Sequence, residues 1–420
     1  MKERSMSRAS RWRWGCGIAA LVVPVAAAIG LRLGVGWLGG RSPRLAATGE
    51  AVLSPLTGTW LSELLAPLQG GRLLDVHAHL GGSGKGSGCW INPRMESLAH
   101  PRDWMRMRLY ASAAGVDIEQ QDHLWSERME ELARQLPLPS RHLFLAFDYR
   151  YSEDGTRDLE HSEFHVPNDW AHAESERHGV RFGWAASVHP YRKDAVAELQ
   201  RCHGLGARVV KWIPAAQGMD PASDLCLPFF AEMRRLDMTL LVHVGDEQAV
   251  EAAEDRELGN PLRLRVPMGQ GVRILAAHCA SLGLSLDLEA AGQPAVPSFD
   301  LFLRLMEDPL YEDLLFGEIS TLTQINRFAV ALPALLARPE LHHRLVNGSD
   351  WPLPNVNVLY RLQPLAKAGL LQPGDLPGLK EIYEHNPLLF DLALKLAVRS
   401  PDSGQGFAAG VFLDRPEWGL

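Results

Sequence analysis

Cysteine is scarce in this chain of 420 residues, and the few cysteines present are not arranged in pairs. There are five, an odd number, and no two are separated by only two residues. A disulfide framework favours an even set, and a cysteine-type zinc site needs Cys-x-x-Cys pairs. The sequence therefore argues against both kinds of site. The cysteines are Cys16, Cys89, Cys202, Cys226 and Cys279.

Positive charge is scarce outside the first 44 residues. The whole chain has a net charge of −8. Residues 1–44 hold eight Lys or Arg against one Glu, a charge of +7, which leaves −15 for the remainder. A body this acidic is a poor partner for nucleic-acid phosphates, so we expect no nucleic-acid binding. With 46 % hydrophobic and 22 % charged residues, the composition is that of a globular protein and excludes wholesale disorder.

A phosphate-binding loop is also missing where the sequence comes nearest to one. Residues 81–88 are rich in glycine, but Lys85 is followed by Gly86 instead of Ser or Thr. No helix-forming stretch follows directly, so the segment fails the Walker pattern. We interpret it as a flexible hinge.

An apolar run follows the basic residues at the amino end. Residues 17–31 are uncharged and almost wholly apolar, and apolar and glycine residues continue beyond Arg32. Positive charge before such a run is typical of a secretory signal or a signal anchor. A buried amphipathic helix is disfavoured because no polar stripe of 3.6-residue period is present. We therefore assign residues 1–45 to a signal anchor or signal peptide plus linker. We expect a membrane-anchored protein with its main domain outside the cytoplasm, or a secreted or periplasmic one if residues 1–28 or so are cleaved.

From residue 72 onward, short β-rich runs alternate with helix-like segments, the pattern of βα units around a parallel sheet. Eight runs fit one (β/α)₈ TIM barrel, which takes about 250 residues. A doubly wound open sheet needs only about five or six strands and normally has a glycine turn for phosphate after the first, so the strand count favours the barrel. The eight runs are 72–76, 142–147, 181–188, 207–213, 239–244, 272–277, 314–319 and 344–348.

The connection between the first two runs is about 65 residues long, which is uncommon unless the segment has a function. We interpret residues 81–140, approximately, as a cap insertion over the mouth of the barrel, with helices around 102–114 and 123–135. The expected organisation is then the amino-terminal segment followed by one barrel domain over 46–420.

Two histidines stand two residues apart at the end of the first run, in the Asp-Val-His-Ala-His string of residues 75–79. Side chains two apart on a strand point the same way, so His77 and His79 project together. Two imidazoles so placed suit a first-row metal ion. Taken alone, the pair is also compatible with packed or exposed histidines.

Ligand-type residues stand at the same relative place in four further runs. His243 ends the fifth, His278 follows the sixth, Asp350 follows the eighth, and Lys211 lies late in the fourth. In a barrel, the carboxyl ends of all strands meet at one mouth, where such enzymes keep their chemistry. His189, after the third run, is instead interpreted as a packing or pocket-lining residue.

In these motifs the sequence resembles the amidohydrolase superfamily, in its amidohydrolase-related, metal-dependent hydrolase branch. The resemblance extends over about residues 72–398, with the motifs in the family's order. It implies a metal-dependent barrel but no particular substrate, because the branch includes hydrolases of amides, esters and lactones as well as decarboxylases and hydratases. The matching motifs are Asp-Val-His-Ala-His at 75–79, Val-Lys-Trp-Ile-Pro at 210–214, the histidines at 243 and 278, Gly-Ser-Asp-Trp-Pro at 348–352 and Glu-His-Asn-Pro at 384–387.

The resemblance also implies roles for these residues. His77, His79, His243 and Asp350 would hold one divalent ion, most plausibly Zn²⁺, with a coordination position open for water. The ion would acidify that water and polarise the substrate carbonyl. Asp350 would take the proton and return it to the leaving group. His278 would stabilise the oxyanion or act as a second acid or base.

Lys211 leaves two metal arrangements open. In binuclear relatives a lysine at this position is carboxylated and bridges two ions. Lys211 would then share one ion with His77, His79 and Asp350, while His243 and His278 would hold the other. Trp212 departs from the smaller or polar residue expected after this lysine.

Three classes of function follow. We predict a metal-dependent hydrolase acting on a C–N or C–O bond of a small molecule, an amide, ester or lactone. A decarboxylase or hydratase on the same barrel is the alternative. A non-catalytic, membrane-tethered binding protein would show gaps among the ligand residues, and the sequence has none. Homo-oligomers are compatible with all three.

Overall fold

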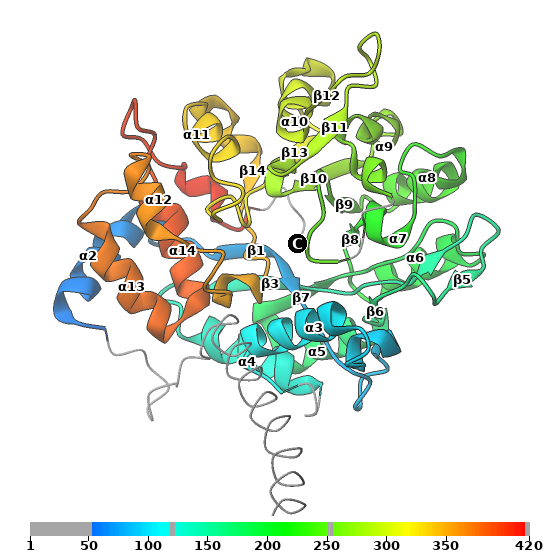
Figure 1. The fold of residues 1–420 in the computed structure, drawn as a ribbon, viewed down its shortest axis with the longest axis horizontal. Coiled ribbons are helices and arrows are strands. Elements are labelled where there is room, and N and C mark those ends of the chain that lie inside the picture. The colour runs from blue at the N-terminus through cyan, green and yellow to red at the C-terminus, as the bar shows by residue number, and fades with distance from the viewer. Residues whose placement is uncertain (1–52, 118–121, 251, 253–254, 416–420) are drawn as a thin grey trace, which may run out of the picture.

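The structure, a computed structural model, describes residues 53–117, 122–250, 252 and 255–415. Within them, eight parallel strands surround a common axis (Figure 1). Each overlaps one of the eight runs identified in the sequence. The strands are β1 (Leu73–His79), β3 (Ser140–Leu145), β7 (Phe182–Ala185), β8 (Val209–Trp212), β9 (Thr239–His243), β10 (Arg273–Ala277), β13 (Leu315–Glu318) and β14 (Leu345–Val346).

These strands form two parallel sheets that join into a closed barrel. One sheet has the order β1-β3-β7 and the other β8-β9-β10-β13-β14. A parallel bridge between Ala186 and Val210 connects the end of β7 to β8, and a second one between Ala78 and Trp351 connects β1 to the segment after β14. Because neighbouring strands follow chain order all the way round, the open doubly wound sheet is excluded.

Alternate residues of the strands fill the inside of the barrel. A compact apolar cluster combines residues from all parts of the circle, among them Leu74, Leu143, Val209, Leu241 and Leu275. Residues that point the other way pack against the surrounding helices in a larger cluster. This alternation follows from the two-residue period of a strand, and it leaves the strand ends free to carry polar side chains.

Helices form an outer layer around the barrel (Figure 1). The last of them, α14 (Pro387–Ala397), is buried along its whole length. It begins at Asn386, whose side chain accepts hydrogen bonds from the backbone N–H groups of Leu388 and Leu389, with proline in the first helical position. The others are α2 (Pro55–Leu65), α5 (Asn168–His178), α6 (Ala195–Gly204), α7 (Pro214–Gln217), α8 (Leu227–Arg235), α9 (Arg265–Gly269), α10 (Ser298–Glu307), α11 (Ala331–Leu336), α12 (Leu362–Lys367) and α13 (Asp375–His385).

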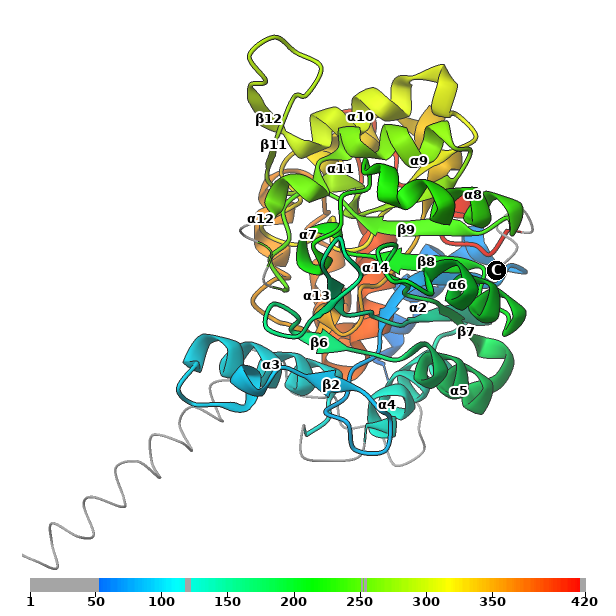
Figure 2. The ribbon, with the colours of Figure 1, turned by 90° about the vertical axis from the view of Figure 1, so that its right-hand side faces the viewer.

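Segments from two connections lie together on one side of the barrel (Figure 2). Helices α3 (Pro101–Ala114) and α4 (His123–Arg134) lie between β1 and β3. Strand β2 (Trp90–Ile91) of the same connection pairs antiparallel with β6 (Phe164–His165), which belongs to the next connection. The length of the first connection predicts this cap from the sequence, whereas the contribution of the second connection has no such signal. Two short antiparallel pairs complete the strands: β4 (Arg150–Tyr151) with β5 (Arg157–Asp158), and β11 (Leu284–Leu286) with β12 (Ala295–Pro297).

Hydrogen bonds fix this region to the barrel. Trp125 Nε1 of α4 donates to the carbonyl oxygen of His79 at 2.9 Å. Tyr110 of α3 donates from its hydroxyl to the carbonyl of Ala249 at 2.8 Å. The glycine-rich loop is also held: the N–H groups of Ser83 and Gly84 donate to the Asp122 carboxylate at 2.8 and 2.9 Å. The segment interpreted as a hinge is thus an ordered loop around a carboxylate.

In the part of the chain that the structure describes, no helix has the length and apolar character needed to cross a membrane. The signal or anchor segment predicted over residues 1–45 lies outside the described residues.

Candidate metal centre

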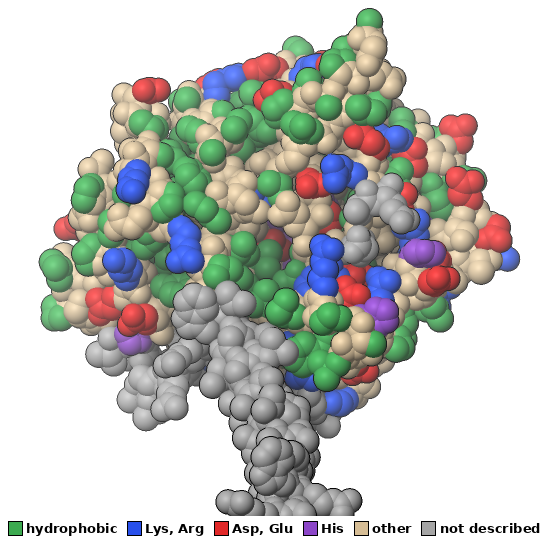
Figure 3. Space-filling model, viewed as in Figure 1, with side chains coloured by type: hydrophobic (Ala, Val, Ile, Leu, Met, Phe, Trp, Pro, Cys, Tyr) green, Lys and Arg blue, Asp and Glu red, His purple; other side chains and the backbone are tan. Residues whose placement is uncertain are grey.

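All six metal-site or catalytic residues proposed from the sequence line one pocket of about 300 Å³ at the carboxyl ends of the strands. Hydrophobic side chains gather around the centre of the corresponding face (Figure 3). Four of the six, His77, His79, Lys211 and His243, stand on barrel strands, and His278 and Asp350 follow β10 and β14.

Three donor atoms converge at one place in the pocket, which we call its front; the residues that carry them, His77, His79 and Asp350, are called the front group. His77 Nε2 lies 3.2 Å from His79 Nε2, and Asp350 Oδ1 lies 3.4 and 3.1 Å from these two nitrogens. A tetrahedral ion with bonds of 2.0–2.1 Å separates its ligands by about 3.3 Å, so this triangle has the size of one face of such a site. Two imidazoles and a carboxylate are also a suitable donor set for zinc. His77, His79 and Asp350 therefore fit a divalent ion.

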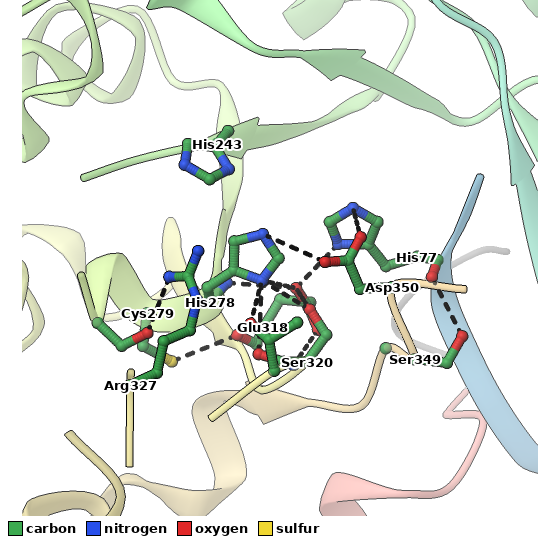
Figure 4. Close-up of polar contacts among 12 residues, drawn as sticks. His77, His243, His278, Cys279, Glu318, Ser320, Arg327, Ser349 and Asp350 are labelled. Atoms are coloured by element: carbon green, nitrogen blue, oxygen red, sulfur yellow. Dashed lines mark hydrogen bonds and ion pairs between the residues drawn. The ribbon is translucent and has the colours of Figure 1, made fainter. Parts of the chain in front are cut away.

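Glu318, the last residue of β13, sets the orientation of His77 from behind. Its Oε2 lies 3.0 Å from His77 Nδ1, and Ser320 Oγ donates to the same oxygen at 2.7 Å. A carboxylate can only accept here, so His77 carries its proton on Nδ1 and presents a bare Nε2 to the front (Figure 4). Sequence analysis missed Glu318, although it ends the seventh run as the proposed ligands end theirs.

Asp75 joins the two chain segments that carry the front ligands. Its Oδ1 accepts hydrogen bonds from the backbone N–H groups of His77 at 3.1 Å and Ser349 at 2.8 Å, and its Oδ2 contacts His142 Nδ1 at 3.0 Å. Burial alone would raise the pKa of Asp75, but the hydrogen bond and charge of His142 hold it below its ordinary value. Asp75 therefore acts as an ionised clamp, a role distinct from the neighbouring histidines.

Asp350 occupies a sharp turn. Its φ is +56°, in the left-handed region, and its N–H donates to the His77 carbonyl at 2.7 Å. Strain of this kind persists only where the surroundings impose it, and it is common at functional sites. Burial would raise the pKa of Asp350, but the electrostatic interaction with His77 and the hydrogen bond with His79 outweigh this effect and hold the pKa well below its ordinary value. The side chain is thus an ionised base.

His278 lies behind Asp350, with its Nε2 4.0 Å from Asp350 Oδ2. Its Nδ1 is 2.8 Å from Ser320 Oγ and 3.0 Å from Thr321 Oγ1. Burial, reinforced by the positive charge of Arg327, lowers the pKa of His278 well below 6.5. The residue is therefore a neutral imidazole. It also forms a second three-residue group of possible ligands with His77 and Glu318.

Lys211 lies against the front group. Its Nζ is 3.1 Å from His77 Nε2, and the side chain is completely buried. Burial lowers its pKa to about 8. A lysine so placed carries a substantial neutral fraction, the form that reacts with carbon dioxide.

His243 lies in the same pocket but apart from the three-residue groups. Its ring is 5.0 Å from that of His278, its Nδ1 is 3.0 Å from Glu247 Oε2, and its Nε2 faces the Asp246 carbonyl at 3.3 Å. Burial lowers the pKa of His243 against the pull of Glu247. Among the described residues, neither group of three possible His, Cys, Asp or Glu ligands includes His243.

Comparison with known proteins gives distant solved structures. A crystal structure described as amidohydrolase II is 13 % identical, with 77 % of this chain and 99 % of that chain covered and a TM-score of 0.41. 5-Carboxyvanillate decarboxylase from Sphingomonas paucimobilis is 13 % identical, with 68 % of this chain and 92 % of that chain covered and a TM-score of 0.39. 2,6-Dihydroxybenzoate decarboxylase from Rhizobium is 14 % identical, with 77 % of this chain and 99 % of that chain covered and a TM-score of 0.36. Likenesses this distant do not identify a substrate.

Among curated proteins the sequence finds no match. A family model described as Amidohydrolase does match, over residues 75–388, from the clamp Asp75 to the first turn of α14. This range contains all the side chains that surround the pocket's polar end. By this match over most of its length, the chain belongs to the amidohydrolase family, and it is an enzyme.

Proposed function

We propose that the protein is a metal-dependent hydrolase that directs water at a C–N or C–O bond of a small molecule, an amide, ester or lactone. The observation that supports this most is the position of the Asp350 carboxylate. One of its oxygens faces the two front imidazoles and the other faces His278. A single ionised group is thus in reach of both the ion site and a second acid–base residue.

His77, His79 and Asp350 would hold the ion, which we propose to be a single Zn²⁺. A divalent ion there would make water more acidic and polarise a carbonyl oxygen. His243 and Lys211 line the same pocket, and we propose that His243 contacts the ion's open side and Lys211 the substrate.

The protein's own groups supply the proton transfers. Asp350 accepts a proton from the attacking water through its free oxygen and later returns it to the leaving nitrogen or oxygen. The neutral imidazole of His278 is held by the hydroxyl groups of Ser320 and Thr321, so that its Nε2 edge faces the reaction. In this mechanism the Thr321 hydroxyl donates to Nδ1, so Nε2 carries the proton and donates a hydrogen bond to the negative charge that develops on the substrate.

Metal analysis and kinetics of the full chain test the proposal. We expect about one Zn²⁺ per chain, loss of turnover after chelation and its recovery with Zn²⁺. On a panel of lactones, esters, amides and aryl carboxylates, Asp350→Asn should reduce kcat by about 10²–10⁴-fold, the usual contribution of an acid–base group. Full turnover by this variant would overturn the assignment of Asp350. Release of carbon dioxide from an aryl carboxylate would instead establish a decarboxylase.

A further inference from the structure

Arg327 is a charged side chain in the pocket without a charged partner. It lies in the segment after β13, is only 8 % exposed and lines the pocket. Among the described residues, its guanidinium makes one hydrogen bond, from Nη1 to Ser281 Oγ at 3.2 Å. Its buried Nε–H has no acceptor. The sequence analysis did not identify this residue.

The two carboxylates that share the pocket with Arg327, those of Glu247 and Asp350, interact with other groups. Glu247 is 3.0 Å from His243 Nδ1 and also accepts from the backbone N–H of Ala249. Asp350 faces the imidazoles of the metal centre. No ion pair within 4.0 Å joins Arg327 to any described residue. A buried charge with a single hydrogen bond and no ion pair is costly, so an arrangement of this kind indicates a ligand that supplies further acceptors.

The position of Arg327 suits an anchor more than a reacting group. In Figure 4 the guanidinium lies beside His278, on the side away from Asp350. An anion bound there and a carbonyl group beside Asp350 would lie on opposite sides of the His278 ring, in the same pocket.

The remaining wall of the pocket is largely apolar. It includes Ile91, Met107 and Phe164 from the cap side and Ile213, Leu353 and Val356 from the barrel side. Apolar surface of this kind binds a bulky hydrocarbon or aromatic group. The pocket thus offers one cationic anchor, one polar reaction centre and an apolar chamber.

We propose that Arg327 binds a carboxylate of the substrate, and that the substrate is a carboxylate-bearing amide, ester or lactone with a bulky apolar group. An N-acyl amino acid is the simplest amide of this class. The identity of the reacting bond in this substrate rests on the proposed hydrolase function. The binding of the carboxylate by Arg327 does not depend on turnover. The carboxylate serves only for binding, does not react and is retained in the product.

Binding of a non-reacting pair of probes tests Arg327 separately from catalysis. The pair is 4-phenylbutanoate and its neutral analogue 4-phenylbutanamide, titrated calorimetrically into the full chain with Zn²⁺ and after chelation. We expect the carboxylate to bind about 30-fold more tightly than the amide in both forms, because a charge-assisted hydrogen bond contributes this much. Arg327→Gln should abolish the preference, and Arg327→Lys should restore part of it. Arg338→Gln, at a surface pair with Glu307 and Glu340, is the matched control and should keep it.

Two results would overturn the inference. One is equal binding of the two probes by the metal-free wild type, which needs no variant. The other is a preference that persists in Arg327→Gln but disappears on chelation, since the ion would then be the carboxylate site. If Arg327→Gln does not fold, Ser281→Ala, which removes only the hydrogen bond to the guanidinium, should weaken the preference. Failure of Asp350→Asn to reduce turnover would affect the proposed reaction and leave these binding results unchanged.

Discussion

His77 Nδ1 donates a hydrogen bond to Glu318 Oε2 at 3.0 Å, and this bond decides which nitrogen of the imidazole faces the front of the pocket. Burial would raise the pKa of Glu318, but the hydrogen bond and the electrostatic interaction with His77 hold it below its ordinary value. An ionised carboxylate in this position fixes the tautomer and makes Nε2 a better donor to a metal.

The first prediction concerns this pair. Glu318→Gln replaces one acceptor oxygen with an amide N–H, which conflicts with donation from His77 or from Ser320. We expect the affinity for Zn²⁺ to fall about 10–100-fold, the usual effect of removing a partner behind a metal ligand. Competition with a chromophoric chelator measures this. Glu340→Gln, at an exposed glutamate, is the control, and equal affinities for the two variants would contradict the role of Glu318.

A second prediction follows from the space around Gly348, two residues before Asp350. A Cβ atom at this position would lie 2.5 Å from Glu318 Oε1 and 2.7 Å from His77 Cβ. Gly348→Ala should therefore displace both side chains, weaken Zn²⁺ binding and lower the free energy of unfolding by about 1–3 kcal/mol. Chelator competition and denaturant unfolding measure the two effects.

Gly374→Ala is the matched control, because nothing lies within 4 Å of its would-be Cβ. It should leave the metal affinity unchanged. If Gly348→Ala bound Zn²⁺ as tightly as Gly374→Ala, the close packing of Gly348 against Glu318 and His77 would have no role in orienting the ligands.

The barrel could be predicted from the sequence because its strands are short apolar runs separated by helix-forming segments. The convergence of the proposed ligands followed from the fold alone, since strand ends meet at one mouth. The structure places all six in one pocket. Which of them approach within bonding distance of one another did not follow, because it depends on side-chain rotamers and on the turn at Asp350.

The features that sequence analysis missed are those defined by contacts between distant segments. Glu318 stands near the end of its run, as the proposed ligands do, but its role follows only from its position 3.0 Å from His77, which is 241 residues away. Among the described arginines, Arg327 stands out only by being buried in the pocket with one hydrogen bond and no ion pair. Strand β6 is two residues long, too short to produce a periodic pattern, and only its pairing with β2 reveals it.

A third prediction concerns Lys211 and the number of ions. The described residues form two groups of three possible ligands that share His77, and Lys211 Nζ lies 3.1 Å from Nε2 of that histidine. We expect one Zn²⁺ per chain in the wild type. Lys211→Met should keep that stoichiometry and bind Zn²⁺ at least as tightly, because a nearby ammonium group repels the ion. Metal analysis and chelator competition check both.

A two-ion enzyme would behave differently. The wild type would then contain two ions and Lys211→Met would lose one or both. Turnover that falls in carbon dioxide-free buffer and returns with bicarbonate would also establish a carboxylated lysine.

The final prediction is a pH dependence of stability that originates at His189. This buried side chain donates from Nε2 to the Gln217 carbonyl at 2.9 Å and accepts at Nδ1 from the Tyr191 N–H at 3.2 Å, so the neutral ring is satisfied on both sides. Burial lowers its pKa to about 4. The unfolded chain binds a proton there below about pH 6.5, and the folded chain only near pH 4, so stability falls as pH falls through this window. The free energy of unfolding that this one residue contributes should be about 2 kcal/mol lower at pH 5 than at pH 7.5.

Urea unfolding at pH 5 and pH 7.5 measures this loss. The difference in the free energy of unfolding between the two pH values should be correspondingly smaller for His189→Gln than for the wild type, and equal differences in the two proteins would exclude His189 as the origin.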